Sequence, residues 1–378
     1  MKYLLKYCLI FLALSFSCSQ ENILKYTVSI FSSEGGNVTL NGGTFNRGEE
    51  LLVSAIPEIG YIFSNWSNGS TENPIKLLIT DNVNITAIFK KKYQTKNVIV
   101  IVIDGARYSE TWGDVSHKNI PYLHNEMSKH GVINTEFYND GPTYTVAGHT
   151  SITTSVYQEI DNSGKEYPMN PSFFQFWNEK FSKEKKSSLI ITSKSKLEVL
   201  DNCLDESYID EYQPSVNCGL NGLGSSNRVD NLTLYELTHI MQRDKPNLIL
   251  IQFKEPDVSG HSGDWNKYLD GIKSSDLLSY EIFSFIKENT YYKNNTSIFI
   301  TNDHGRHIEG VSDGFISHGD GCIGCRHINF FAYGPDFKQG VIVENKRELI
   351  DIAPTIGELL GFNMNSEKGD IMFELFKQ

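Results

Sequence analysis

The sequence predicts an α/β protein with a doubly wound, mostly parallel sheet, preceded by a small all-β domain. Three runs, at 98–103, 248–253 and 297–301, consist almost entirely of apolar residues instead of alternating apolar and polar ones. This pattern is typical of parallel strands buried on both faces. Further strand-like runs at 188–193 and 328–334 leave intervals long enough for crossover helices. The 378 residues suffice for one large domain and one small one.

The N-terminus has the pattern of a signal peptide. It begins with Lys2 and Lys6 and continues into an apolar stretch that is too short to span a bilayer comfortably and ends in small residues. Cys18 resembles the lipobox cysteine of bacterial lipoproteins, which is lipidated and becomes the mature N-terminus. We therefore expect residues 1–18 to form a signal peptide and lipobox, and the protein to be exported and anchored to a membrane by lipid, in the periplasm or on the cell surface of a bacterium. A plain secretory signal is the alternative.

Residues 26–91 have the composition of a small β module, in which short alternating runs are separated by Gly-Gly, Asn-Gly and Pro. The whole segment, including the Gly35-Gly36 turn and Trp66 at a core position, resembles a single divergent B-repeat of bacterial surface proteins. The resemblance implies a spacer, with contact to the cell surface or to glycans as the alternative. Residues 92–96 form the expected polar linker.

The predicted α/β domain extends over residues 97–378. Its first strand is followed by a helix-like segment around 121–130. The stretch 348–362 predicts a closing amphipathic helix, because Pro354 lies near its start and Gly361 just past its end.

The formal net charge of -12 argues against a nucleic-acid polymer as the main partner. Four cysteines lie beyond the predicted signal, and an even number in an exported protein suggests disulfides. The simplest pairing is Cys203–Cys218 and Cys322–Cys325. The second pair forms a C-x-x-C that could instead bind a metal, but a zinc knuckle needs a partner pair. The other two cysteines lie far upstream with different spacing, so the disulfide is favoured.

Carboxylates and histidines stand where four strands are expected to end, and the functional crevice of an open α/β sheet lies beyond these ends. They are Asp104, Asp257, His261, Asp303, His304 and His318. Oxygen and imidazole ligands without thiolate suit zinc, or manganese at a more open site. Their number is about right for two ions, and two ions about 4 Å apart would clamp the attacking and leaving oxygens of a phosphoryl transfer. Each of these motifs alone is weak evidence for a metal site, since an aspartate after a strand often caps a helix.

A threonine beside such ions is a candidate nucleophile, because a cation stabilises the alkoxide and lowers its pKa. The segment PTYTVAGH at 142–149 resembles the nucleophile segment of the alkaline phosphatase superfamily. The similarity is to its nucleotide pyrophosphatase/phosphodiesterase branch and to the related Thr-dependent phosphatases. It extends from about Asn97 to Gly361, and the second threonine of the family's P-T-x-T falls on Thr145.

The resemblance implies a role for each candidate ligand. One metal would be held by Asp257, His261 and His318, and the other by Asp104, Thr145, Asp303 and His304, both ions most simply being Zn²⁺. Thr145 would attack phosphorus in line and form a phospho-threonine. The expected activity is hydrolysis of a phosphoric ester.

Two lysines after the strand-like run at 188–193 bear on the substrate. Lys194 and Lys196 resemble the Lys-x-Arg clamp of the Thr-type phosphomonoesterases, with Lys196 in the place of the arginine. Two extra positive charges favour a dianionic monoester over a monoanionic diester, although lysine lacks the bidentate geometry of arginine. The stretch 157–162 resembles a shortened form of another family segment, which would make Asn162 an oxyanion contact.

The expected partner is therefore a small phosphorylated substrate, and a phosphate monoester is favoured over a diester or nucleotide pyrophosphate. A sulfatase is disfavoured because the sequence has no C/S-x-P-x-R string. A different class is a surface adhesin or glycan-binding protein whose hydrolase domain is inactive. Competent ligands at every metal position argue against that class, and metal binding discriminates between the two.

Overall fold

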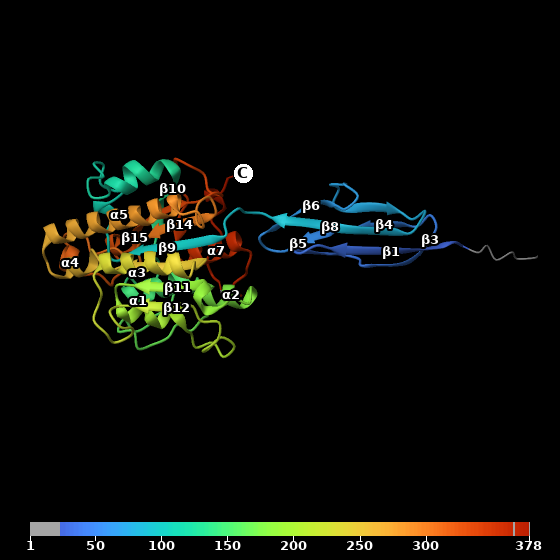
Figure 1. Ribbon diagram of the computed structural model, residues 1–378. Coiled ribbons are helices and arrows are strands. Elements are labelled where there is room, and N and C mark those ends of the chain that lie inside the picture. The colour runs from blue at the N-terminus through green and yellow to red at the C-terminus, as the bar shows by residue number, and fades with distance from the viewer. Residues whose placement is uncertain (1–22, 366, 378) are drawn as a thin grey trace, which may run out of the picture. The chain divides into compact units, whose positions relative to one another are not determined.

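The computed structural model describes residues 23–365 and 367–377 (Figure 1). The predicted signal peptide and Cys18 lie outside this part of the chain. Within it, no helix combines the length and the apolar character needed to cross a membrane. The described chain divides into two compact units, one formed by residues 23–57 and 63–89 and the other by residues 58–62 and 90 onward.

The N-terminal unit is all β, as the sequence predicts. Its four-stranded sheet has the order β3 (Gly42–Asn46), β1 (Lys25–Ser32), β8 (Val83–Lys91) and β6 (Tyr61–Trp66). Two ribbons pair β2 (Gly36–Val38) with β5 (Ala55–Pro57) and β4 (Glu50–Val53) with β7 (Ile75–Leu78). Trp66 is fully buried, and its ring N–H donates to the carbonyl of Glu72 at 2.9 Å, so the indole is packed without a lost hydrogen bond.

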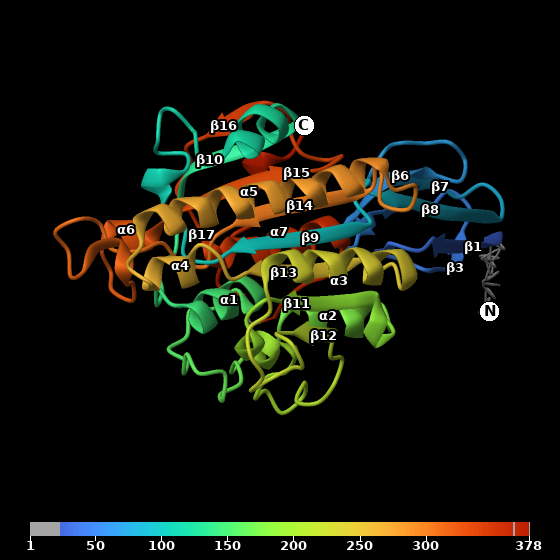
Figure 2. The same ribbon diagram turned by 60° about the vertical axis from the view of Figure 1, so that its left-hand side comes forward.

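The second unit is built on a nine-stranded sheet (Figure 2). Its order is β12 (Ser215–Cys218), β11 (Ser188–Thr192), β13 (Leu248–Phe253), β9 (Asn97–Ile103), β14 (Thr296–Thr301), β15 (His327–Tyr333), β10 (Gly131–Tyr138) and β16 (Val341–Val343), with β17 (Arg347–Glu348) also paired to β10. Strand β15 runs antiparallel to both of its neighbours. Every other neighbouring pair in the described sheet is parallel. The predicted mostly parallel architecture is confirmed.

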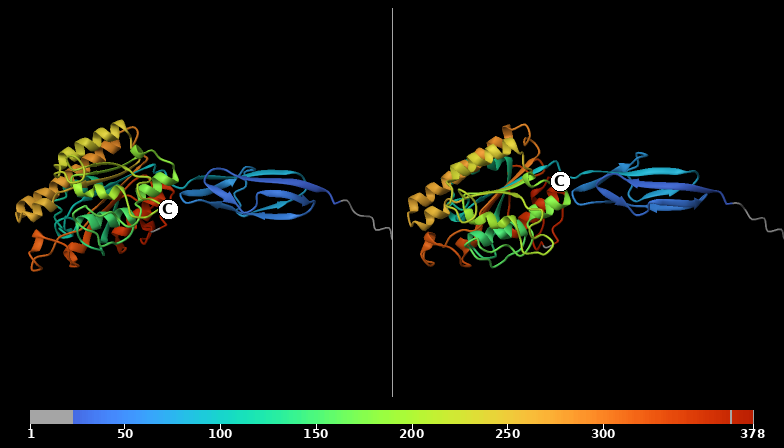
Figure 3. Two further views of the ribbon diagram at one scale, coloured as in Figure 1. Left: turned by 90° about the horizontal axis from the view of Figure 1, so that it is seen from below. Right: turned by 60° about the horizontal axis from the view of Figure 1, so that its bottom comes forward.

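Helices cover both faces of this sheet (Figure 3). On one face lie α1 (Thr145–Thr154), α2 (Phe173–Lys180) and α7 (Ile352–Leu360), and on the other α3 (Asp230–Arg243) and α5 (Trp265–Glu288). Successive side chains of a strand point to opposite faces. In β9, Val100 therefore packs into the core under α1 and α7, while Ile101 packs into the core under α3 and α5. This double burial explains why the strand is continuously apolar.

Short helical turns complete the unit. They are the α-helical turns α4 (Asp257–His261) and α6 (Ile323–Arg326), the π-helical turn η2 (Leu123–Met127), and the 3-10 turns η1 (Tyr108–Glu110), η3 (Ser128–His130), η4 (Lys185–Ser187), η5 (Ser195–Asp201), η6 (Gly314–Ile316), η7 (Leu349–Asp351) and η8 (Phe373–Leu375). The helix-like segment predicted around 121–130 is thus a π turn followed by a 3-10 turn. The predicted closing helix is α7, with Pro354 in its first turn and Gly361 at a left-handed C-terminal position with φ of 82°.

The predicted disulfides are not formed among the described residues, where all four cysteines are free. Cys218 ends strand β12, and its thiol packs in the core 4.0 Å from the carbonyl of Ile190. Cys203 is buried separately after η5. Sequence spacing constrains neither the distance nor the direction of the two Cβ atoms that a disulfide requires, which is why the cysteine count misleads here.

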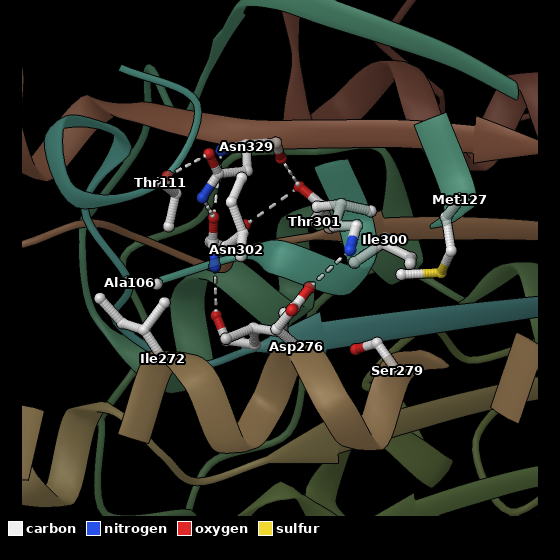
Figure 4. A pocket seen from close by; sticks show the side chains of 13 residues that line it. Ala106, Thr111, Met127, Ile272, Asp276, Ser279, Ile300, Thr301, Asn302 and Asn329 are labelled. Atoms are coloured by element: carbon white, nitrogen blue, oxygen red, sulfur yellow. Dashed lines mark hydrogen bonds between the residues drawn. The ribbon is translucent and has the colours of Figure 1, made fainter. Parts of the chain in front are cut away.

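A small cavity of about 20 Å³ is lined by side chains of α5, of the segment between β9 and β10, and of β14 and β15 (Figure 4). The carboxylate of Asp276 on α5 accepts the backbone N–H groups of Tyr122 and Leu123, each at 2.8 Å. Burial raises the pKa of Asp276 to about 7, against the lowering effect of these two donors. The folded state therefore holds this proton more tightly than the unfolded chain, whose aspartates titrate near pH 3.9.

The stabilisation from this protonated carboxyl is complete below about pH 4 and is lost as pH rises through 7. We expect the unfolding free energy of the wild type, measured relative to Asp276→Asn, to fall by up to about 3 kcal/mol between pH 4 and 7. Urea unfolding of both proteins across this range measures the difference. A difference that is constant with pH would contradict the assignment.

Candidate active site and metal centre

The first cluster consists of Asp257, His261 and His318. Asp257 and His261 lie one turn apart on α4, directly after β13, so both side chains face the same side. His261 Nε2 lies 3.3 Å from Asp257 Oδ1 and 3.2 Å from His318 Nε2, and His318 Nε2 lies 3.4 Å from Asp257 Oδ1. His318 Nδ1 is 2.8 Å from the carbonyl of Thr143, which fixes the ring with Nε2 toward the cluster.

His318 differs from its predicted position. It was expected at the end of a fourth strand, but it lies in a loop after η6, before β15 begins. An irregular loop brings it to the cluster, and no periodic pattern in the sequence marks such a loop.

The second cluster consists of Asp104, Asp303 and His304, which follow the adjacent strands β9 and β14. His304 Nε2 lies 3.5 Å from Asp104 Oδ1 and 3.4 Å from Asp303 Oδ2. All three atoms are buried and have no hydrogen-bond partner in the described part of the chain. Unpaired buried polar atoms are costly, so they need an additional partner. A divalent cation supplies one, and the donor set fits it.

The orientation and protonation state of His304 suit a metal ligand. Its Nδ1 lies 2.8 Å from the carbonyl of Gly305, so Nδ1 carries the proton and Nε2 presents its lone pair to the carboxylates. Burial lowers the pKa of His304 to about 3, which keeps the imidazole neutral as metal binding requires. A ring nitrogen of His304 also lies within 4.8 Å of ligand atoms of Asp257 and His318, so this side chain lies beside both clusters.

Lys194 joins the two clusters to the candidate nucleophile. Its buried ammonium lies 2.8 Å from Asp104 Oδ2 and 2.6 Å from Asp257 Oδ2. It also donates to Thr145 Oγ1 at 3.1 Å. Burial alone would lower the pKa of Lys194, but the neighbouring carboxylates raise it above its ordinary value, so the side chain stays protonated. A buried cation paired in this way fixes the relative positions of the groups it contacts.

Thr145 is the first residue of α1 and is buried. Asn162 lies at the same helix end, where its Oδ1 accepts the N–H of Val146 at 3.0 Å and the ammonium of Lys196 at 2.9 Å. Burial, and then the charge of Lys194, lower the pKa of Lys196 to about 8. The structure therefore places the predicted nucleophile and all three predicted substrate contacts around the start of α1.

Sequence reasoning missed His149 and Gln252. His149 Nδ1 lies 2.8 Å from the carbonyl of Thr145 and 3.4 Å from Asp303 Oδ2, so it connects α1 to the second cluster. Gln252 Nε2 donates to Asp104 Oδ2 at 2.8 Å, and its Oε1 accepts the N–H of Lys194 at 3.1 Å. For Gln252, the sequence did offer a signal, because it is a polar residue inside the otherwise apolar strand β13.

Arg306 and Asn302 were also missed. The Arg306 guanidinium pairs with the Asp257 carboxylate. Asn302 donates to the carbonyl of Ile103 at 2.7 Å and accepts from the side chain of Asn329 at 2.6 Å (Figure 4). It thereby ties the ends of the neighbouring strands that carry the second cluster. In the sequence, the one indication of a role for Arg306 and Asn302 was that they lie close to the predicted ligands Asp303 and His304.

Residues 96–364 match the family model of the Metalloenzyme superfamily. The chain belongs to this superfamily. Residues 26–93 match the Divergent InlB B-repeat domain. None of the curated proteins matches the sequence. The expected metal-dependent enzyme and the B-repeat module are both confirmed. The B-repeat is consistent with an extracellular or surface protein.

Solved structures share the fold of this metalloenzyme at low sequence identity. A protein in the alkaline phosphatase superfamily from Vibrio parahaemolyticus is 18% identical, with a TM-score of 0.53 and coverage of 73% of this chain and 69% of that chain. The phosphonate monoester hydrolase SpPMH from Silicibacter pomeroyi is 14% identical, with a TM-score of 0.53 and coverage of 74% and 76%. Murine ectonucleotide pyrophosphatase/phosphodiesterase 5 is 15% identical, with a TM-score of 0.53 and coverage of 74% and 100%.

Proposed function

We propose that this metalloenzyme hydrolyses phosphate monoesters, using Thr145 as the nucleophile and passing through a phospho-threonine. The observation that carries the proposal is the position of Lys194. Its ammonium contacts Thr145 Oγ1 and one carboxylate from each cluster, so the hydroxyl lies beside both candidate metal positions. A lone structural threonine would not need a buried cation shared in this way.

Two divalent cations, most simply Zn²⁺, fit the two clusters. One would be held by Asp257, His261 and His318, and the other by Asp104, Thr145, Asp303 and His304. When bound, they supply Lewis-acid stabilisation of the negative charge that develops in phosphoryl transfer. Their identity and number are part of the proposal.

The side chains around Thr145 favour its attack on phosphorus. The positive end of α1 and the ammonium of Lys194 both stabilise negative charge on Thr145 Oγ1 and on the phosphoryl oxygens. The attack forms the bond from Thr145 Oγ1 to phosphorus and breaks the bond to the leaving oxygen; the Thr145 hydroxyl gives up its proton to water, and the leaving oxygen takes one up and departs as the alcohol. Water then hydrolyses the phospho-threonine and releases phosphate.

The two lysines support a monoester as substrate. Lys194 and Lys196 add two positive charges near the nucleophile, and these attract a dianion more strongly than a monoanion. We propose that Asn162, which contacts Lys196, orients an oxyanion through its amide N–H. The proposed partner is thus a small phosphorylated molecule.

Phosphodiester or nucleotide pyrophosphate hydrolysis is the second candidate, and one comparison favours it. An inactive variant of murine ectonucleotide pyrophosphatase/phosphodiesterase 5, with a threonine replaced by alanine, was solved in complex with AMP. That fold-level neighbour is 15% identical to this chain.

The test compares p-nitrophenyl phosphate with bis-p-nitrophenyl phosphate, using zinc-loaded protein that begins at Ser19. A higher kcat/KM on the monoester would support the proposal, and a higher value on the diester would favour the second candidate. Turnover of neither ester together with no bound metal would indicate an inactive surface protein. We also propose that the natural protein is exported and anchored through Cys18, with the B-repeat as a spacer.

Lys196 predicts a pH dependence of the monoesterase. With a pKa of about 8, this lysine is charged below that pH and neutral above it. We expect kcat/KM on the monoester to fall as pH rises through 8 in the wild type, and Lys196→Arg to show no such fall because arginine stays charged. Lys196→Ala should lower the monoester kcat/KM at pH 7 by roughly 10-fold. Its diester kcat/KM should change little, and an equal loss on both esters would contradict the role.

A further inference from the structure

A second set of potential ligands lies outside the two clusters, in the segment between His304 and β15. It consists of His307, Asp320, Cys322 and Cys325, and one ligand atom of each lies within 4.8 Å of the others. The ligand atoms of a tetrahedral zinc ion, with bonds of about 2.0 to 2.3 Å, are separated by about 3.3 to 3.8 Å. The four side chains therefore need only a small contraction to enclose an ion.

His307 points to a missing partner. The residue is only 5% exposed, and its Nε2 is buried without a hydrogen-bond partner in the described part of the chain. The same atom lies 3.3 Å from Asp320 Oδ1. An orphaned buried nitrogen is destabilising unless another group takes its lone pair. Because His307 groups with the carboxylate and the two cysteines, a cation at the centre of the group would satisfy this nitrogen.

The other face of the His307 ring is fixed as in metal-ligating histidines. Nδ1 lies 3.1 Å from Ser317 Oγ and 3.5 Å from Asp313 Oδ1. Ser317 in turn donates to the Asp313 carboxylate. A carboxylate or hydroxyl on one nitrogen orients the ring and directs the other nitrogen to the metal.

Cys322 directly precedes the short helix α6, and Cys325 lies within it. The N–H of Cys325 donates to the carbonyl of Cys322 at 3.1 Å, which closes a tight turn. The N–H of Cys322 donates to Asp320 Oδ1 at 2.9 Å, which holds the carboxylate next to the turn. A C-x-x-C turn presents two thiols to one ion. The sequence offered no second cysteine pair for such a site, whereas the fold supplies a histidine and an aspartate instead.

We propose that His307, Asp320, Cys322 and Cys325 form a third metal site that binds Zn²⁺ through two thiolates, one imidazole and one carboxylate. Soft sulfur ligands combined with nitrogen and oxygen select zinc over magnesium or calcium. Four protein ligands leave no open position, so the site is structural rather than catalytic.

This third site connects the two segments that carry His304 and His318. The N–H of Gly305 donates to the carbonyl of Cys325 at 2.8 Å, so α6 lies directly against the residue after His304. A Cβ added at Gly305 would lie 2.0 Å from the carbonyl oxygen of Gly324, so the backbone at Gly305 packs against the backbone of α6 with no room for a side chain. An ion held between His307 and the cysteines thus acts as a positioning element for both histidine ligands.

Cobalt substitution tests the proposal without relying on turnover. The two clusters contain no sulfur, so a thiolate-to-cobalt charge-transfer band in the near ultraviolet can arise only from a cysteine site. The mature chain, reduced and loaded anaerobically with Co²⁺, should show this band and one metal equivalent more than Cys322→Ser. Cys203→Ser changes a buried free cysteine that is far from this segment in the sequence, and it should keep both the band and the additional metal equivalent.

His307→Gln provides a second variant with both thiols intact, in case Cys322→Ser does not fold. We expect it to lose one equivalent of zinc, as measured by elemental analysis, and to shift or lose the cobalt band. Absence of the band in the reduced wild type, or an equal metal content in wild type and both variants, would overturn the proposal. Thr145→Ala should keep the band, so a failure of the proposed phosphatase activity remains distinguishable from a failure of this site.

Discussion

Thr145→Ala is expected to lower kcat/KM on p-nitrophenyl phosphate by roughly 1,000-fold or more, because the variant lacks the atom that attacks phosphorus. The hydroxyl is buried at the first residue of α1 and receives a hydrogen bond from Lys194. No other hydroxyl is held in this way by Lys194 in the described part of the chain. Steady-state rates of the two metal-loaded proteins measure the effect.

Thr145→Ser is the matched control, because it keeps the hydroxyl and removes one methyl group. We expect it to retain activity within about 10-fold of the wild type. Acid quenching during turnover should trap one phosphoryl group per chain in the wild type and none in Thr145→Ala, as read by mass spectrometry. Activity of the alanine variant close to that of the wild type would exclude Thr145 as the nucleophile.

His304→Gln is expected to lower both the metal content and the activity. The His304 imidazole lies near ligand atoms of both clusters, so its loss weakens two sites together. We expect the variant to lose one or two metal equivalents on dialysis, with a fall in kcat/KM of at least about 100-fold. Elemental analysis and steady-state kinetics measure the two effects.

His239→Gln is the control for this prediction, because His239 is exposed on α3 and contacts only Tyr235 among the described interactions. It should keep the metal content and rate of the wild type. The thiolate-to-cobalt band should survive in His304→Gln, which would separate the two clusters from the third site. Full metal retention in His304→Gln would show that this histidine is not a ligand.

The sequence alone determined the sheet and the strand-end carboxylates. The runs that form β9, β13 and β14 are continuously apolar because both faces of these strands are covered, and this burial is a local property that the residue pattern records. Asp104, Asp257 and Asp303 follow these strands, and parallel strands deliver their ends to one edge of the sheet. The nucleophile segment was recognisable because its motif is contiguous.

Only the tertiary structure decided how these groups are connected. Strand β15 is buried and mostly apolar like β9 and β14, yet it runs antiparallel to both of its neighbours, because its direction depends on the chain path rather than on its residues. The bridge from Lys194 to Asp104 and Asp257 joins segments far apart in the sequence. Irregular loops bring His318 to its cluster and His307 to the cysteines, and such loops have no period to detect. The burial of a strand is therefore predictable from the local residue pattern. Which residues far apart in the sequence come into contact depends on strand order and on the path of the loops.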